Sequence, residues 1–171
     1  MRLQENSCRC QIYKIIVSLV KLSSMKSIIL TYVKTYLDQR MQTSLDAMNA
    51  AQESANGESK SSAGDKYETS RAMGQLDRDM HARMYQQTRE ERKLVERIDG
   101  NINFKKGAFG AFISTSMGDF FLSVSVGQVE INEKPIMIIS PQSPIGVLLM
   151  GKMEGDKFSF RGKEAVILAI E

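Results

Sequence analysis

The sequence predicts an α+β protein in which an N-terminal antiparallel coiled-coil helical hairpin is followed by a small antiparallel β domain with one short helix. Three observations predict this class. Apolar residues recur at helical spacing up to residue 98, a polar stretch rich in glycine and serine interrupts that pattern at residues 56–64, and apolar and polar residues alternate after Gly100. A chain of 171 residues has room for both parts, which we place at residues 27–99 and 101–171.

Residues 1–26 form a basic and apolar extension. They carry five basic residues and one acidic residue, a net charge of +4, and the whole chain carries +3, so the remainder is at −1. A nearly neutral remainder gives no broad electrostatic reason for binding nucleic acid directly. The apolar run at residues 12–20 contains Lys14 and is shorter than the roughly 18 residues of a membrane span. We expect either an extra helix or a translation start at Met25, and a cytoplasmic protein in both cases.

The first helix of the hairpin is predicted from about Ser27 to Ala55. Its apolar positions follow steps of three and four residues, which keeps them on one face of a helix. The polar stretch that follows stops the helix and places the tip of the hairpin near residues 56–65. The predicted stripe consists of Leu37, Met41, Leu45, Met48, Gln52 and Ala55.

The second helix is predicted to begin after Asp65, which serves as its N-cap with Glu68 in capping-box register, and to end at Asp99-Gly100. Two mostly polar helices joined by a short turn predict an antiparallel arm, about 45 Å long for about 30 residues per helix. We expect the apolar residues of the second helix to pack in the seam between the two helices. They are Met73, Leu76, Met80, Met84, Gln87, Leu94 and Ile98.

The β domain is predicted from short runs of β-forming residues separated by turns. The strands fall at residues 107–116, 119–126, 129–131, 136–139, 158–160 and 165–170. Ser143-Pro144 is typical of a helix start, and this short helix runs through Leu149 and stops at Gly151.

The composition argues against several kinds of catalytic site. The chain has one histidine, His81, no tryptophan, and two cysteines, Cys8 and Cys10. A zinc cluster needs four ligands, and a disulfide framework needs more cysteines than this. A nucleophile activated by histidine would have to use His81, which lies in a polar helical stretch. In the β domain, a helix cap explains Ser143 better than a nucleophile does, and Gly155-Asp156 is more typical of a β-turn than of a ligand.

The predicted tip carries four carboxylates: Glu53, Glu58, Asp65 and Glu68. Mg²⁺ is often held by one or two carboxylates together with water, so a projecting arm can deliver ligands into another protein's active site. The alternative is that these acids are caps and solubilising charges. Lys60 and Lys66 lie in the same stretch and would compete with a cation for them.

The segment from Ile139 to Asp156 resembles the C-terminal signature of the GreA/GreB transcript-cleavage factor family. It reads Ser-Pro-Ile-Gly at residues 143–146, then a leucine-rich turn, Gly151-Lys152 and Gly155-Asp156. The resemblance extends over residues 27–171 and implies a coiled-coil hairpin followed by an FKBP-like β domain. It also implies that the signature residues contribute to docking on a partner: Ser140, Ser143, Pro144, Ile145, Gly146, Gly151, Lys152, Gly155 and Asp156.

The implied partner is the core of bacterial RNA polymerase. In this family the β domain docks at the rim of the secondary channel, the hairpin enters the channel, and tip acids help to hold a second Mg²⁺ so that the polymerase cleaves its own backtracked RNA. The resemblance therefore implies a monomeric accessory factor of transcription elongation, not an enzyme. No cofactor of its own, no DNA sequence recognition and no membrane are expected.

The tip departs from the family pattern. Aligning the family's tyrosine on Tyr67 places Lys60 and Ala63 where the two functional acids belong. Glu58 and Asp65 are the candidate substitutes for holding Mg²⁺.

Three alternatives remain. They are a polymerase-channel regulator that does not stimulate cleavage, a peptidyl-prolyl isomerase with an FKBP-like site lined by some of the seven phenylalanines, and a structural coiled-coil adaptor with no polymerase role.

Overall fold

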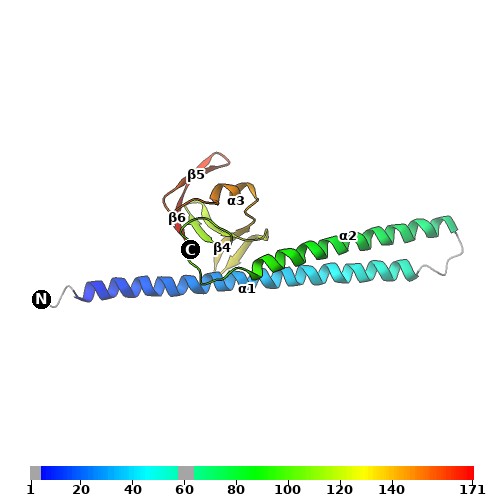
Figure 1. Ribbon diagram of the computed structural model, residues 1–171, viewed down its shortest axis with the longest axis horizontal. Helices are drawn as coiled ribbons and strands as arrows, with labels where there is room; N and C mark the ends of the chain where they lie inside the picture. The colour runs from blue at the N-terminus through cyan, green and yellow to red at the C-terminus, as the bar shows by residue number, and fades with distance from the viewer. Residues whose placement is uncertain (1–4, 58–63) are drawn as a thin grey trace. The chain divides into compact units, whose positions relative to one another are not determined.

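The computed structural model describes the backbone of residues 5–57 and 64–171 and the side chains of residues 25–54, 69 and 71–171. The chain folds into two compact units. One unit is Val33–Arg97, and the other combines Met1–Tyr32 with Ile98–Glu171. The protein has the predicted α+β class, with two helices followed by a six-stranded sheet and one short helix (Figure 1).

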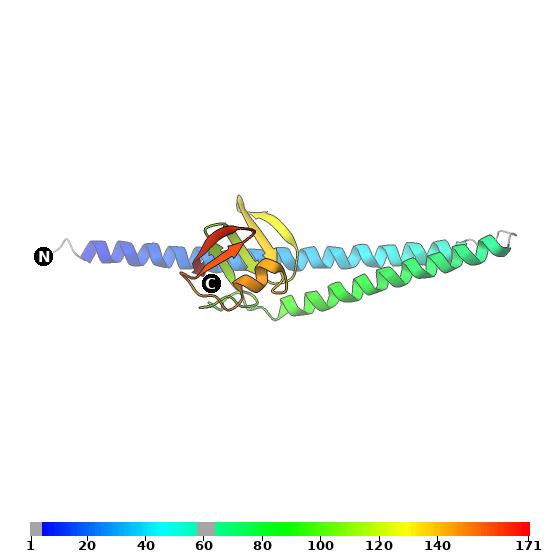
Figure 2. The ribbon, with the colours of Figure 1, turned by 90° about the horizontal axis from the view of Figure 1, so that it is seen from above.

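The helical unit is built from α1 (Glu5–Gly57) and α2 (Gly64–Glu96). Helix α1 begins well before Ser27, so residues 5–26 continue the helix that was predicted to start there. Helix α2 already contains Asp65, which therefore lies within the first turn and not at the N-cap position. Within the unit the two helices lie side by side and run in opposite directions (Figures 1 and 2).

Side-chain bonds between the two helices fix their antiparallel register. Arg92 Nε donates to Asp38 Oδ1 at 2.9 Å, and Arg78 Nη1 donates to Gln52 Oε1 at 3.1 Å. In each pair the residue numbers add to 130, as expected for helices that run in opposite directions. The buried side chains of this unit are few, and two of them are hydroxylic. They are Val33, Leu37, Ser44, Thr88 and Val95.

The predicted seam of α2 is wrong. Six of its seven residues are exposed, among them Leu76 at 64% and Met73 at 55%, and only Ile98 is buried. Of the nine covered positions that the structure describes in α2, seven follow strict steps of four and three residues, a spacing of 3.5 that keeps one face turned toward a partner helix. They are Gly74, Arg78, His81, Tyr85, Thr88, Arg92 and Val95. The cross-helix ion pairs hold this polar face inward, and the apolar residues consequently lie outside the seam.

The stripe predicted on α1 is better placed. Leu37 is fully buried, and Met41, Leu45, Met48 and Gln52 are half-buried. The side chain of the sixth member, Ala55, lies outside the described residues. The stripe therefore borders the seam of α1, whose other buried positions in this unit are Val33 and Ser44.

The other unit contains a six-stranded sheet in the order β3-β4-β2-β1-β6-β5. The strands are β1 (Phe112–Thr115), β2 (Gly118–Leu122), β3 (Gly127–Ile131), β4 (Lys134–Ile139), β5 (Lys157–Phe160) and β6 (Lys163–Ile170), with α3 (Pro144–Leu149) between β4 and β5. Two-residue turns at Asn132-Glu133 and Arg161-Gly162 close the β3–β4 and β5–β6 hairpins with positive φ at all four positions, as type I′ turns require.

The prediction of a purely antiparallel sheet is wrong. Strands β2 and β4 pair in parallel, with Phe121 opposite Ile138. Strand β4 reaches this position because the chain passes from β2 to the edge strand β3 and then turns back. Both central strands are buried on both faces, with Phe120 and Leu122 on the side of the main core and Phe121 on the other side. The continuous apolar runs in β2 and β4 are typical of such doubly covered strands.

Residues 26–30 of α1 pack on the segment that precedes β1 in the same unit. Lys26 is 1% exposed, and its Nζ donates to the carbonyl oxygen of Ile102 at 2.7 Å and lies 4.9 Å from the centre of the Phe104 ring. Ile29 and Leu30 are buried nearby on the same helix. Lys26, which we assigned to the basic extension, is thus a buried residue of the folded unit.

Candidate functional site

The candidate site is the segment around α3, which contains the sequence signature. Ser143 is the N-cap of α3: its Oγ accepts a hydrogen bond from the Gly146 amide at 3.1 Å and donates one to the Ser140 carbonyl oxygen at 2.7 Å. Pro144 occupies the first helical position, where no backbone donor is needed. The predicted helix cap at Ser143 is therefore confirmed.

Gly146 lies so close to the preceding loop that no other residue fits there. A Cβ atom at this position would lie 2.1 Å from the Ser140 carbonyl oxygen. Gly107 meets α3 from the opposite end in the same way, since its Cβ would lie 2.0 Å from the Leu149 carbonyl oxygen. The two glycines thus let α3 pack directly on the backbone around it.

The segment after α3 is held by backbone bonds. The Gly151 amide donates to Gly107 O, and the Gly107 amide donates to Lys152 O, each at 2.8 Å. Residues 153–156 form a β-turn in which the Asp156 amide donates to Met153 O at 3.1 Å and Gly155 has φ +85°. Asp156 Oδ2 accepts from the Met153 amide at 2.8 Å. The predicted turn at Gly155-Asp156 is confirmed, and its carboxylate serves the turn.

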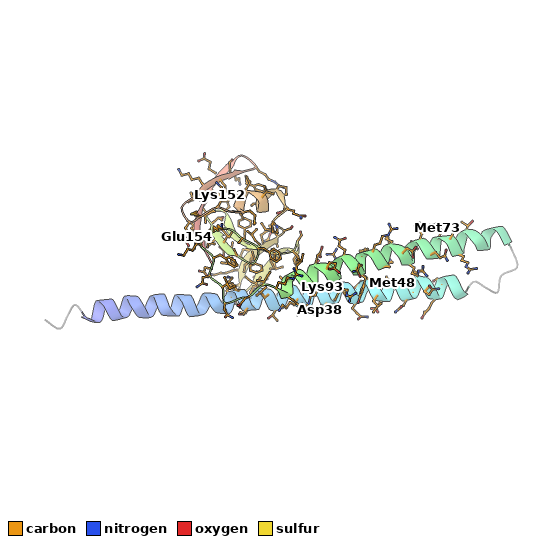
Figure 3. The ribbon with its side chains drawn as sticks, in the orientation of Figure 1. Asp38, Met48, Met73, Lys93, Lys152 and Glu154 are labelled. Atoms are coloured by element: carbon orange, nitrogen blue, oxygen red, sulfur yellow. The ribbon has the colours of Figure 1, made fainter. Side chains whose placement is uncertain are left out.

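The signature residues therefore lie together, and several of them build the segment's backbone. Gly146 is buried, whereas Pro144 and Asp156 are exposed. Figure 3 shows Lys152 and Glu154 on the stretch that leads from α3 to β5. Glu154 Oε1 accepts from the Ile170 amide at 2.9 Å and so joins this stretch to β6.

Three exposed apolar side chains lie within the same seven residues, and the sequence reasoning missed them. Val147 is 61% exposed, Met150 is 42% exposed and Met153 is 58% exposed. Val147 and Met150 are spaced i, i+3, and each directly follows a buried residue, Gly146 or Leu149. This spacing is the signal that would have placed both on the outward side of α3 and its C-cap. These three side chains, together with the half-buried Lys152, define what we call the α3 face.

The candidate tip acids are not brought into a site by the described residues. Glu58 lies outside the described residues, and Asp65 lies in the first turn of α2 with its side chain outside them. Among the side chains that the structure describes, no three histidine, cysteine, aspartate or glutamate residues are placed to hold a metal ion.

Two ionisable groups of the sheet unit have shifted pKa values, the buried Lys26 and the half-buried Glu171. Burial lowers the pKa of Lys26 below its usual value, and the nearby charges of Glu171 and Asp99 oppose that change. Burial raises the pKa of the Glu171 carboxyl, opposed by Lys26 and assisted by Glu154. In the helical unit, His81 Nδ1 is buried without a hydrogen-bond partner in the described part of the chain. None of the three lies in the α3 segment.

No protein-family model matches the sequence, and a search of curated proteins gives no match. Within residues 5–57 and 64–171, no helix combines the length and the apolar character that crossing a membrane requires.

Proposed function

We propose that this protein is a GreA/GreB-like transcription elongation factor that binds the core of bacterial RNA polymerase at its secondary channel. Its action there is to modulate elongation as an accessory protein in the cytoplasm. The observation that carries the proposal is the α3 segment, in which the signature residues of 139–156 form one connected structure with an exposed apolar face.

The helical unit supports the part of the proposal that concerns the arm. Seven covered positions of α2 repeat at 3.5-residue spacing, as in a left-handed coiled coil, and cross-helix bonds set an antiparallel register. Helix α2 has 33 residues, which corresponds to a length of about 50 Å. A coiled-coil hairpin of this length suits insertion into a narrow channel.

The α3 face supports the docking part. Val147, Met150 and Met153 present apolar surface on a segment whose backbone is fixed by Gly146 and Gly107, so the face is preorganised. A rigid apolar patch beside a lysine is typical of a protein-binding surface. We propose that this face, and not the capping serines, supplies most of the contact with the polymerase.

Stimulation of RNA cleavage is a separate part of the proposed activity. It would require Glu58 and Asp65 to contribute carboxylate ligands to an Mg²⁺ ion that belongs to the polymerase active site. A channel regulator that does not stimulate cleavage retains the same docking face and arm.

The isomerase alternative is weakened by the packing of the phenylalanines. Phe112, Phe120, Phe121 and Phe158 are each at most 8% exposed, and Phe104 and Phe160 pack against the main core. Aromatic side chains used in this way are core residues and do not line a peptide-binding pocket.

A binding experiment with purified core polymerase tests the docking face. The double variant Val147→Glu with Met150→Glu should weaken binding at least tenfold, because two carboxylates would be buried against an apolar partner. The matched control is Leu168→Glu on β6, which is equally exposed at 60% but lies outside the α3 face. Equal binding by wild type and the double variant would contradict the proposal.

A cleavage experiment separates the two forms of the proposal. Stalled, backtracked complexes are incubated with wild type or with the Glu58→Ala and Asp65→Ala double variant. Cleavage above the polymerase's intrinsic rate that the double variant loses would establish the acids as metal ligands. Binding without extra cleavage would identify a regulator that occupies the channel.

A further inference from the structure

Four apolar side chains form an exposed line on α2, here called the α2 stripe. Met73 is 55% exposed, Leu76 is 64% exposed, Met80 is 48% exposed and Met84 is 40% exposed. Steps of three, four and four residues place all four on one face of the helix. Figure 3 labels Met73 near one end of this line.

The exposed apolar stripe does not follow from a generally apolar helix, because α2 places polar and small residues in its contact with α1. Arg78 and Thr88 face α1, while the methionines are left outside. Scattered exposed apolar residues are normal on protein surfaces, but a continuous row of them marks a contact surface. Methionine suits such a surface because its flexible side chain adapts to an irregular partner.

Charges beside the stripe indicate what covers it. Asp79 and Arg83 are four residues apart and therefore lie on the same flank of the stripe. In a contact between two identical chains related by a two-fold axis, residue i of one copy meets residue j of the other, and j meets i. A flank with one acid and one base, spaced along the helix, is self-complementary in such a contact.

We propose that the α2 stripe pairs with the α2 stripe of a second copy of this chain, antiparallel and centred on Met80. In this arrangement Met80 meets Met80 of the second copy, and Leu76 lies opposite Met84. Asp79 of each copy then lies within about 3 Å, along the helix axis, of Arg83 in the other copy. Asp79 already pairs with Arg78 of its own chain at 2.9 Å, but its side chain remains 55% exposed and can accept a second donor.

The size of the stripe sets the strength of this contact. Its four residues cover 12 positions, or about 16 Å of helix, so the contact buries much less surface than the roughly 800 Å² per partner of stable complexes. The dimer should therefore be concentration-dependent, with a Kd on the order of 10 µM or weaker. The proposal does not rest on polymerase binding, and because the stripe lies on α2, a paired chain would have to dissociate before its arm could enter the channel.

Disulfide trapping tests the register. In a background with Cys8→Ser and Cys10→Ser, Met80→Cys should yield a disulfide-linked dimer under mild oxidation, because the two copies of position 80 face each other. The matched control is Met73→Cys, whose two copies lie about 21 Å apart along the helix axis and cannot form a disulfide. Dimers from both variants would indicate parallel pairing and overturn the proposal, as would the absence of dimers from both.

Charge reversal tests the pairing of the flanks. Asp79→Arg alone and Arg83→Asp alone should each weaken self-association about tenfold in sedimentation velocity, since like charges then meet across the contact. An equimolar mixture of the two variants should recover wild-type association, because each arginine again meets an aspartate. Circular dichroism verifies that both variants remain helical. Wild-type chain that stays monomeric up to about 200 µM, or variants that associate as wild type does, would overturn the proposal.

Discussion

Lys26 Nζ donates a hydrogen bond to the carbonyl oxygen of Ile102 at 2.7 Å, across 76 positions of the sequence. The ammonium group also lies over the Phe104 ring, at 4.9 Å from its centre. Through these partners, the buried Lys26 ties this part of α1 to the segment that follows α2. It also leaves a charge where burial disfavours one, which has a measurable consequence.

The stability of the sheet unit should therefore depend on pH through Lys26. Because burial lowers the pKa of Lys26, the unfolded chain binds more protons than the folded chain between that lowered value and 10.5. Stability contributed by this group consequently rises with pH across that window, by about 1.4 kcal/mol per unit of lowering. Urea unfolding of wild type and Lys26→Met at several pH values measures the difference.

The control for this prediction is Lys34→Met, a lysine of α1 that is only half-buried. Its unfolding curve should keep the wild-type dependence on pH. Parallel pH profiles for wild type and Lys26→Met would show that the buried ammonium does not carry the effect.

The hydroxyl of Thr88 is predicted to be dispensable. Thr88 is fully buried in the helical unit, and its Oγ1 donates to the Met84 carbonyl oxygen at 2.9 Å within the same helix. That carbonyl already has a helical partner, so Thr88→Val leaves no acceptor unpaired and buries one more methyl group. We expect thermal unfolding to show a gain of up to about 1 kcal/mol. The exposed Thr43, which makes the same bond to Gln39, should give no gain when changed to valine.

Gly146→Ala is predicted to destabilise α3 strongly. The added methyl group would meet the Ser140 carbonyl oxygen at 2.1 Å, and the backbone must shift to make room. We expect a loss of about 1–3 kcal/mol in the free energy of unfolding. Val147→Ala, at the next position but exposed, should change it by less than about 0.5 kcal/mol. A Gly146→Ala protein as stable as wild type would mean that the loop before α3 yields easily.

Glu133→Gly is predicted to stabilise the β3–β4 hairpin. Glu133 has φ +62°, a conformation that costs a side-chain residue about 1 kcal/mol and costs glycine little. The change also creates Asn-Gly, the preferred pair for this turn type. Chemical denaturation should show a gain of about 1 kcal/mol, whereas Glu130→Gly within β3 should show a loss.

The α+β class and all six strand positions were predictable from the sequence, because alternation and turn residues act locally. The parallel pairing of β2 with β4 was not, since it depends on which strands meet after the chain turns back. The continuous apolar run at Phe120–Leu122 was the available signal that β2 is covered on both faces.

The outward position of the α2 methionines was also beyond local reasoning. Both the methionine face and the polar face of α2 repeat at helical spacing, so the sequence alone does not say which one contacts α1. The polar face does so because its residues bond to partners on α1 such as Asp38 and Gln52. The signature predicts a functional segment around α3, but it does not identify the exposed side chains there, because capping and close packing explain Ser143 and Gly146 equally well from sequence.

Strand β6 lies between β1 and β5, so β1 has one open edge until β6 is in place. During synthesis on the ribosome, the chain up to β5 leaves that edge of β1 unpaired in the nascent sheet. An unpaired edge next to Ile113 is a site for unwanted pairing with other chains. This edge of β1 thus stays open until β6 is made, and a pause in synthesis before residue 163 would prolong that exposure.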